Sequence, residues 1–236
     1  MCFGLAASWA MIGAGSVATV ITLRRGEVPA IPATLAFFTV MEALQAAGYA
    51  VIDQCGSPAN QAVTLASYLH IALQPLVINA FCMAIAPVAP SPGMRRAVWL
   101  CAGLASALLL ARLLPGLGAC RPGEVLCGPH WCTVTGTWHL AWDMPLNGLW
   151  RPLADLTGWP MSFPDYMLGV FVLPLLYGAW RFVVMHAALG PVLATWLTDM
   201  PNEMPAVWCL FSIGLLGIGL SPWIRRAVAG PRPHPA

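Results

Sequence analysis

The sequence predicts an all-α fold, a polytopic transmembrane helical bundle of six to seven spans with the N-terminus outside. Of the 236 residues, 59% are apolar and only 8% are charged, whereas about a quarter of a soluble domain is charged. Several apolar stretches reach the roughly 20 residues that a helix needs to cross a bilayer core. All the basic residues are Arg, and most of them lie in pairs beside these stretches.

Five stretches satisfy the length requirement well, and turn-forming Gly and Pro residues separate them. They are residues 4–23, 31–52, 62–86, 94–115 and 203–224. A further helix-compatible run from Tyr166 to Thr198 would be roughly 50 Å long, too long for one span and too short for two spans with a turn. Gly190 and Pro191 are expected to break it. We therefore predict one span that ends near His186 and a half-helix after it, with a short seventh crossing as the alternative.

The Arg pairs predict the orientation, because short Arg-rich loops usually face the cytoplasm. Arg24 and Arg25 follow the first span, and Arg95 and Arg96 precede the fourth. The N-terminus then lies outside, in a multi-pass protein of the inner (plasma) membrane. The pair formed by Arg225 and Arg226 would be inside only with an odd number of crossings, which favours a seventh.

The loop at 116–164 is the one sizeable segment outside the predicted spans, and it is predicted to be extracytoplasmic. Its five tryptophans suit a lid at the membrane interface, where such rings concentrate: Trp131, Trp138, Trp142, Trp150 and Trp159. The loop has no core of its own, so residues 1–236 are predicted to form a single domain.

The predicted orientation places five of the eight cysteines outside, where thiols tend to pair. Cys2 is the one expected to stay unpaired. The candidates for two disulfides are Cys55, Cys120, Cys127 and Cys132. A zinc site built from Cys127, Cys132, His130 and His139 is the weaker alternative, because the spacing matches no paired zinc-knuckle pattern. The sequence assigns no metal and leaves the cofactor unknown.

Ionisable side chains inside a span are costly and are therefore functional candidates. Glu42 lies at the centre of the second span, and Gln45, Tyr49 and Asp53 follow on the same helical face. On the third span Ser67, His70 and Gln74 form a second polar stripe. Hydrogen bonds between helices would explain Gln45, Ser67, Gln74 and Asn79 without chemistry. For Glu42 with His70 we favour a functional role.

A further polar pair lies in the long loop, where His139 and Asp143 would share a face if the run Thr137–Asp143 were helical. The predicted buried polar pocket combines this pair with the two stripes. Its residues are Glu42, Gln45, Tyr49, Asp53, His70, Gln74, His139 and Asp143.

Several segments are similar to a known family. They are Met1-Cys2, Met41-Glu42-Ala43-Leu44-Gln45, Ile52-Asp53-Gln54-Cys55, Ser67-Tyr68-Leu69-His70-Ile71 with Gln74-Pro75, and Trp138-His139-Leu140-Ala141-Trp142-Asp143. Together they resemble an uncharacterised family of bacterial multi-pass membrane proteins, a domain of unknown function. The resemblance covers most of the chain and implies roughly seven helices with no assigned reaction. A looser resemblance is to the ceramidase and adiponectin-receptor-like hydrolases, although this chain lacks their paired His on the last helix.

Three functions remain open from the sequence. The first is a binding, sensing or transport module whose partners are the lipid bilayer and a small-molecule or lipid ligand. The second is an intramembrane metal-dependent hydrolase that uses His70, His139 and His186 with Glu42 or Asp53. The third is a haem or quinone redox protein. The dispersed charge, a net +2, predicts no nucleic-acid partner. Whether the protein is an enzyme stays undecided.

Overall fold

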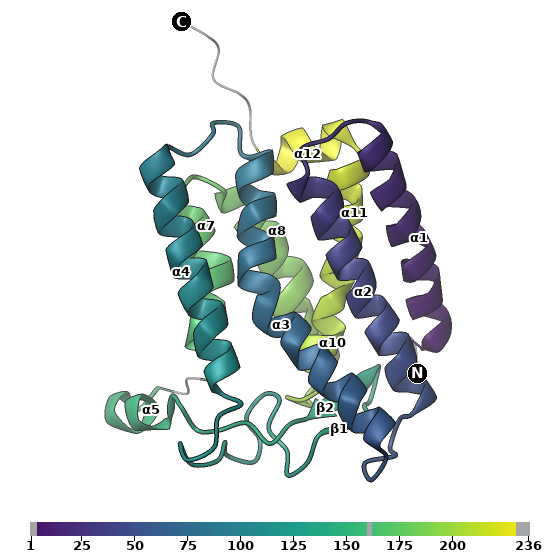
Figure 1. Cartoon of the computed structure of the whole chain (residues 1–236), viewed down its shortest axis with the longest axis vertical. Coiled ribbons are helices and arrows are strands. Elements are labelled where there is room, and N and C mark those ends of the chain that lie inside the picture. The colour runs from purple at the N-terminus through teal and green to yellow at the C-terminus, as the bar shows by residue number, and fades with distance from the viewer. Residues whose placement is uncertain (1–3, 160–161, 230–236) are drawn as a thin grey trace, which may run out of the picture.

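A computed structural model describes residues 4–159 and 162–229, and it is a helical bundle with one small β-hairpin (Figure 1). The first four helices are long and continuous: α1 (Leu5–Arg24), α2 (Ala30–Ala50), α3 (Pro58–Ile85) and α4 (Pro92–Ala111). Proline begins α3 and α4, where its missing N–H costs nothing and its fixed φ suits the first turn. The side-chain oxygen of Ser91 caps α4 by accepting from the Met94 N–H at 3.2 Å.

A cap of hairpin, loops and one short helix covers one end of the bundle (Figure 1). It contains β1 (Cys132–Thr135), β2 (Leu140–Asp143) and α5 (Arg151–Thr157). The strands are antiparallel, with Cys132 opposite Asp143. The predicted helical run Thr137–Asp143 is therefore wrong, since its second half is a strand. Trp142 is fully buried, which shows that β2 packs into the bundle as part of the core.

The remaining helices are interrupted. The first segment is α6 (Pro164–Met167), the π-helical turn η1 (Leu168–Val172) and α7 (Leu173–Leu175). The second is α8 (Trp180–Ala187), the π-helical turn η2 (Ala188–Val192) and α9 (Leu193–Leu197). The third is α10 (Met204–Val207), the 3₁₀ turn η3 (Trp208–Leu210) and α11 (Phe211–Leu220), after which α12 (Pro222–Ala229) is bent away by 110°.

This arrangement corrects the prediction for residues 165–198. The chain turns between α7 and α8, where Gly178 has a φ of +86°, a conformation that suits glycine. The predicted break at Gly190 and Pro191 is confirmed as a kink, because Gly190 has a non-helical backbone conformation, although the segment continues into α9. In the described part of the chain, five helices are long and apolar enough to cross a membrane, the bent pair that ends in α12 would be a sixth, and Pro164–Leu175 is a shorter apolar helix. By length and composition the described residues therefore contain five or six candidate spans, and the seventh crossing stays a prediction.

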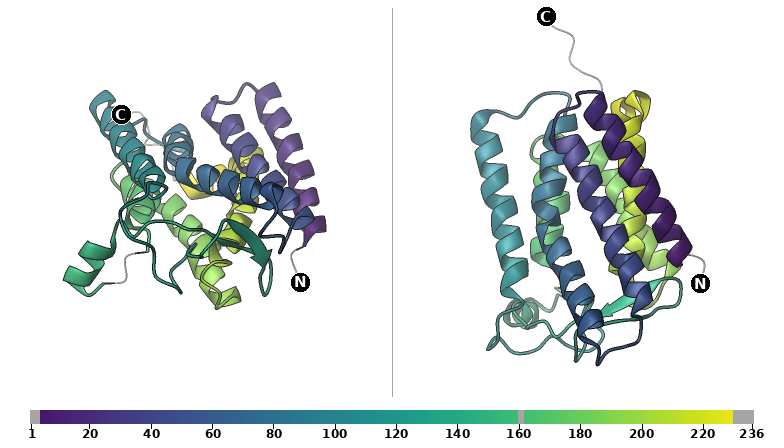
Figure 2. Two further views of the ribbon diagram at one scale, coloured as in Figure 1. Left: turned by 60° about the horizontal axis from the view of Figure 1, so that its bottom comes forward. Right: turned by 45° about the vertical axis from the view of Figure 1, so that its right-hand side comes forward.

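The long helices α1 to α4 form one row, and the interrupted segments pack behind them (Figure 2). The end of α1, the start of α4 and α12, which carry the Arg pairs, all lie at the end of the bundle opposite the cap (Figure 1). There Arg225 forms a salt bridge with Glu27 at 2.7 Å, and Arg25 donates to the Leu220 carbonyl at 2.8 Å. Hydrogen bonding to Arg225 lowers the pKa of Glu27. The seven-segment path thus brings all these Arg pairs to one end, as the predicted orientation requires.

Candidate functional site

Two sizeable cavities lie among the described residues of the bundle, and several of the predicted pocket residues line one or the other. We call them the Trp208 cavity and the Glu42 cavity. The Trp208 cavity has a volume of about 180 Å³ and lies under the cap, among α2, α3 and the interrupted segments. The Glu42 cavity, of about 190 Å³, lies between α1, α2, α10, α11 and the hairpin. Cys209 lines both cavities, so the turn η3 separates them.

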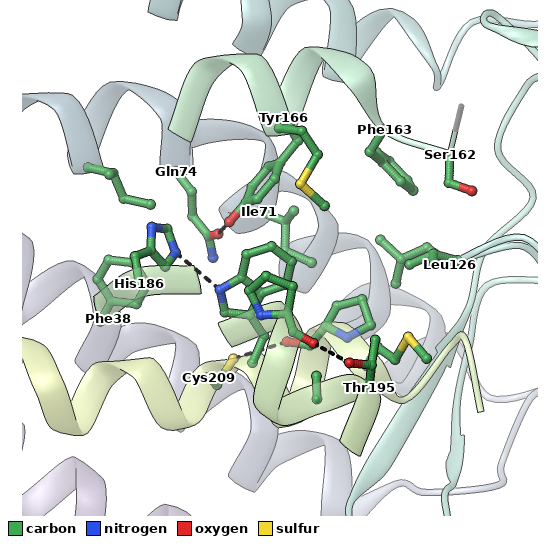
Figure 3. A pocket seen from close by; sticks show the side chains of 18 residues that line it. Phe38, Ile71, Gln74, Leu126, Ser162, Phe163, Tyr166, His186, Thr195 and Cys209 are labelled. Atoms are coloured by element: carbon green, nitrogen blue, oxygen red, sulfur yellow. Dashed lines mark hydrogen bonds between the residues drawn. The ribbon is translucent and has the colours of Figure 1, made fainter. Parts of the chain in front are cut away.

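The walls of the Trp208 cavity are mostly apolar and aromatic, with a few polar groups (Figure 3). The Tyr166 hydroxyl donates a hydrogen bond to Gln74 Oε1. The Trp208 indole N–H donates to His186 Nε2 at 3.1 Å, which requires that nitrogen to be an unprotonated acceptor. The Tyr166 and Trp208 rings meet edge-to-face with their centroids 5.5 Å apart. These contacts fix the aromatic walls and leave the Gln74 amide nitrogen as a donor on the cavity side.

The π-helical turn η2 gives Trp208 its position. Gly190 has φ −99° and ψ −105°, which is not a helical conformation, and a Cβ on this residue would lie 2.2 Å from Trp208 Nε1. The indole can therefore lie against the η2 backbone only because residue 190 is glycine. The irregular backbone lies beside a cavity and not in the long helices α1 to α4.

The Glu42 cavity contains the predicted mid-span acid. Glu42 is only 6% exposed and accepts a hydrogen bond from the Ser212 hydroxyl of α11 at 3.1 Å. Gln45 and His139 line the same cavity. His139 Nε2 bonds Gln45 Oε1 at 2.8 Å, and its Nδ1 bonds the Tyr49 hydroxyl. Four of the eight predicted pocket residues therefore meet here, since Tyr49 joins them through His139.

The other predicted pocket residues lie elsewhere. His70 stacks on Phe37 with ring centroids 3.7 Å apart, and its Nε2 bonds the Phe37 carbonyl at 2.8 Å. It lines neither cavity, and the predicted pairing of Glu42 with His70 gives way to Glu42 with Ser212. Gln74 lies in the Trp208 cavity.

Asp53 and Asp143 hold the cap together. Asp53, at a φ of +62°, accepts from the Thr135 N–H and hydroxyl at 2.8 and 2.6 Å. Asp143 accepts from the Asn202 amide at 2.6 Å. Both carboxylates satisfy donors of the loops, so their contacts indicate a structural role.

The cap also contains both disulfides, and these use the four cysteines that the sequence predicted. Cys55 pairs with Cys132, and Cys120 pairs with Cys127. Cys2 lies outside the described residues. The predicted zinc alternative would need two of these cysteines, which are not available as thiolates.

Glu203 is the functional candidate that the sequence reasoning underrated. It is fully buried and accepts hydrogen bonds from the backbone N–H groups of Thr137, Trp138 and His139 and from the Thr198 hydroxyl. It therefore fixes the hairpin turn above the Glu42 cavity. An acid at the first position of the last apolar stretch was the only signal in the sequence.

The described residues contain no group of three or more His, Cys, Asp or Glu side chains that could hold a metal ion. The three histidines of the hydrolase alternative contact different partners: His70 contacts Phe37, His139 contacts Tyr49 and Gln45, and His186 contacts Trp208.

Comparison with known proteins gives a family and no activity. No curated protein and no solved structure matches the chain. A family model described as "Family of unknown function (DUF5765)" matches residues 6–229, which confirms the expected resemblance to an uncharacterised family. The chain therefore belongs to this family of unknown function.

Proposed function

We propose that the protein is a membrane-embedded binding module whose ligand is a small, mainly apolar molecule with one hydrogen-bond acceptor, held in the Trp208 cavity. The observation that carries the proposal is the cavity itself, enclosed by aromatic and aliphatic side chains with few polar groups. Such a composition is typical of small-molecule sites, in which a few polar groups set the orientation of the ligand.

The polar groups suit one acceptor on the ligand. Gln74 Oε1 is occupied by the Tyr166 hydroxyl, so the Gln74 amide nitrogen is the available donor. A hydroxyl or carbonyl oxygen on the ligand would accept from it, while an apolar chain would contact Phe38, Ile78 and Trp208. Transfer of such a chain from water is favourable by about 0.8 kcal/mol per buried CH₂.

The surroundings of the cavity suit a ligand that arrives through the lipid phase. Thr195 lines the cavity and is exposed on α9. Large apolar side chains nearby are also exposed, among them Val192 at 61% and Trp196 at 81%. An opening beside such side chains would face acyl chains in a membrane. The hydrolase and redox alternatives find no comparable support among the described residues.

Photolabelling of the full-length protein tests the proposal. The probe is a long-chain alcohol with a diazirine and a terminal alkyne, added to protein in vesicles and mapped by mass spectrometry. We expect labels on the peptides that contain Tyr166 and Trp208, and competition by unmodified alcohol. Thr195→Trp, which fills the opening, should abolish them.

The matched control is Val192→Trp, which adds the same side chain on the outer face of the segment and outside the cavity lining. It should label as the wild type does. Equal labelling of the two variants, or labels confined to the outer surfaces of the helices, would refute the proposed site.

A further inference from the structure

The Glu42 cavity differs in chemistry from the Trp208 cavity. Its lining combines one acid, Glu42, with the Ser212 hydroxyl and the Trp138 indole, in walls that are otherwise mainly small or aliphatic. No Arg is among the described residues that line it. A carboxylate at this depth is costly unless a cation or a proton neutralises it.

His139 is the other group on the wall that could carry a positive charge, and its bonds direct it away from Glu42. Its two ring nitrogens bond Tyr49 and Gln45. A Tyr hydroxyl that donates to Nδ1 and an Nε2–H that donates to the Gln45 oxygen form a consistent chain around a neutral imidazole. The positive charge that would pair with Glu42 is therefore left to a ligand.

We propose that the Glu42 cavity binds a small primary alkylammonium ion, a site separate from the proposed site at Trp208. The Ser212 hydroxyl donates to Glu42 Oε1 at 3.1 Å, which leaves lone pairs of both groups as acceptors on the cavity wall. An ammonium has three N–H donors and forms charge-assisted hydrogen bonds with a carboxylate. The Trp138 ring offers a cation–π contact, and the aliphatic wall takes the alkyl chain.

The size of the cavity agrees with such a ligand. Its volume of about 190 Å³ exceeds what a few water molecules fill, at about 30 Å³ each. Several of the side chains that line it, among them Ala7, Ala10 and Ala206, are short, which leaves room for an alkyl chain.

The test uses n-butylammonium chloride and butan-1-ol, which have similar shapes and differ in charge. Binding to the full-length protein in an uncharged detergent is measured by titration calorimetry at neutral pH and constant chloride concentration. We expect n-butylammonium to bind and butan-1-ol to bind at least about tenfold more weakly, since the charge-assisted bond is lost. Glu42→Gln should weaken n-butylammonium binding by a similar factor, and Trp138→Leu by less.

The matched control is Asp155→Asn, which neutralises an acid on α5 that is half-exposed and paired with Arg121. It should bind as the wild type does. Met11→Trp fills the cavity from α1 without changing the acid, and it should abolish binding, which keeps the test valid if Glu42→Gln fails to fold. Equal binding of the alcohol, no binding of n-butylammonium, or full binding by Glu42→Gln would overturn the proposal. In the last two cases Glu42 would be a protonated structural acid. Failure here leaves photolabelling at the Trp208 cavity unaffected, so the two proposals are refuted separately.

Discussion

The four N-terminal helices and the three C-terminal segments are built differently. Helices α1 to α4 each run for 20 to 28 residues without a break in the helix, even though Pro75 lies inside α3. Each of the three later segments contains a π or 3₁₀ turn, and the Trp208 cavity lies among these turns. The four N-terminal helices thus form a continuous scaffold, and the C-terminal segments provide most of the walls of the Trp208 cavity.

The cap joins the two regions, and its bonds to each can be broken separately. Cys55–Cys132 spans 77 residues and ties the α2–α3 turn to β1, whereas Cys120–Cys127 spans only 7. In the loop-entropy model their removal costs about 4 and about 2 kcal/mol, respectively. We expect Cys55→Ala with Cys132→Ala to lower the midpoint of thermal unfolding clearly more than Cys120→Ala with Cys127→Ala. Equal losses would mean that the cap does not depend on the N-terminal scaffold.

Glu203 provides the corresponding link between the cap and the C-terminal region, because its carboxylate accepts hydrogen bonds from the hairpin turn. Glu203→Ala leaves three backbone N–H groups, of which that of His139 is buried, and the buried Thr198 hydroxyl without their acceptor, at a cost of roughly 3 kcal/mol. Relative to the wild type, we expect this substitution to accelerate amide hydrogen exchange at residues 137–139 more than in α2 and α3. Glu124→Gln, a change in the cap away from this network, is the control. A loss of protection from hydrogen exchange that is uniform along the chain would argue against a local role of Glu203.

Gly190 of the C-terminal segments and Gly103 of α4 differ in how closely other side chains pack against them. A Cβ at Gly190 meets Trp208, whereas one at Gly103 of α4 meets nothing within 4 Å. Gly190→Ala should cost roughly 1–3 kcal/mol through overpacking and should reduce photolabelling in the Trp208 cavity. Gly103→Ala should be neutral or slightly stabilising, because alanine favours helix. Unchanged photolabelling of the Trp208 cavity in Gly190→Ala would show that the C-terminal segments adapt to an added methyl group more easily than their geometry indicates.

The smallest expected effect lies at the end opposite the cap. The Glu27 and Arg225 side chains are 21% and 19% exposed, so we expect their pair to contribute no more than about 1 kcal/mol. The pKa of Glu27 is lowered from 4.5, so the stabilisation is present above that pH and is lost as the pH falls through the folded-state value. Glu27→Gln should therefore differ from wild type at neutral pH and converge with it in acid. A difference that persists in acid would assign the effect to something other than this ion pair.

Sequence patterns predicted the scaffold better than the cavity walls. Apolar length and Arg pairs defined α1 to α4, because a span needs a minimum number of apolar residues and the Arg pairs mark its ends. The same criterion missed the turn at Gly178, because that turn lies inside an apolar run, whereas the interruption at Gly190 and Pro191 was predicted correctly. Glu42 was found by its depth. Ser212, Trp208 and Glu203 were not, because their importance depends on contacts between segments far apart in sequence.

The Cys55–Cys132 bond also bears on the order in which the protein is made. Proteins are synthesised from the N-terminus at about 5–20 residues per second, so Cys55 exists before its partner, and α3 and α4 are completed in between. Cys120 and Cys127 emerge almost together and can pair at once. The long-range bond can therefore close only after both of these helices have been made, so it joins parts of a bundle that the short-range bond does not connect.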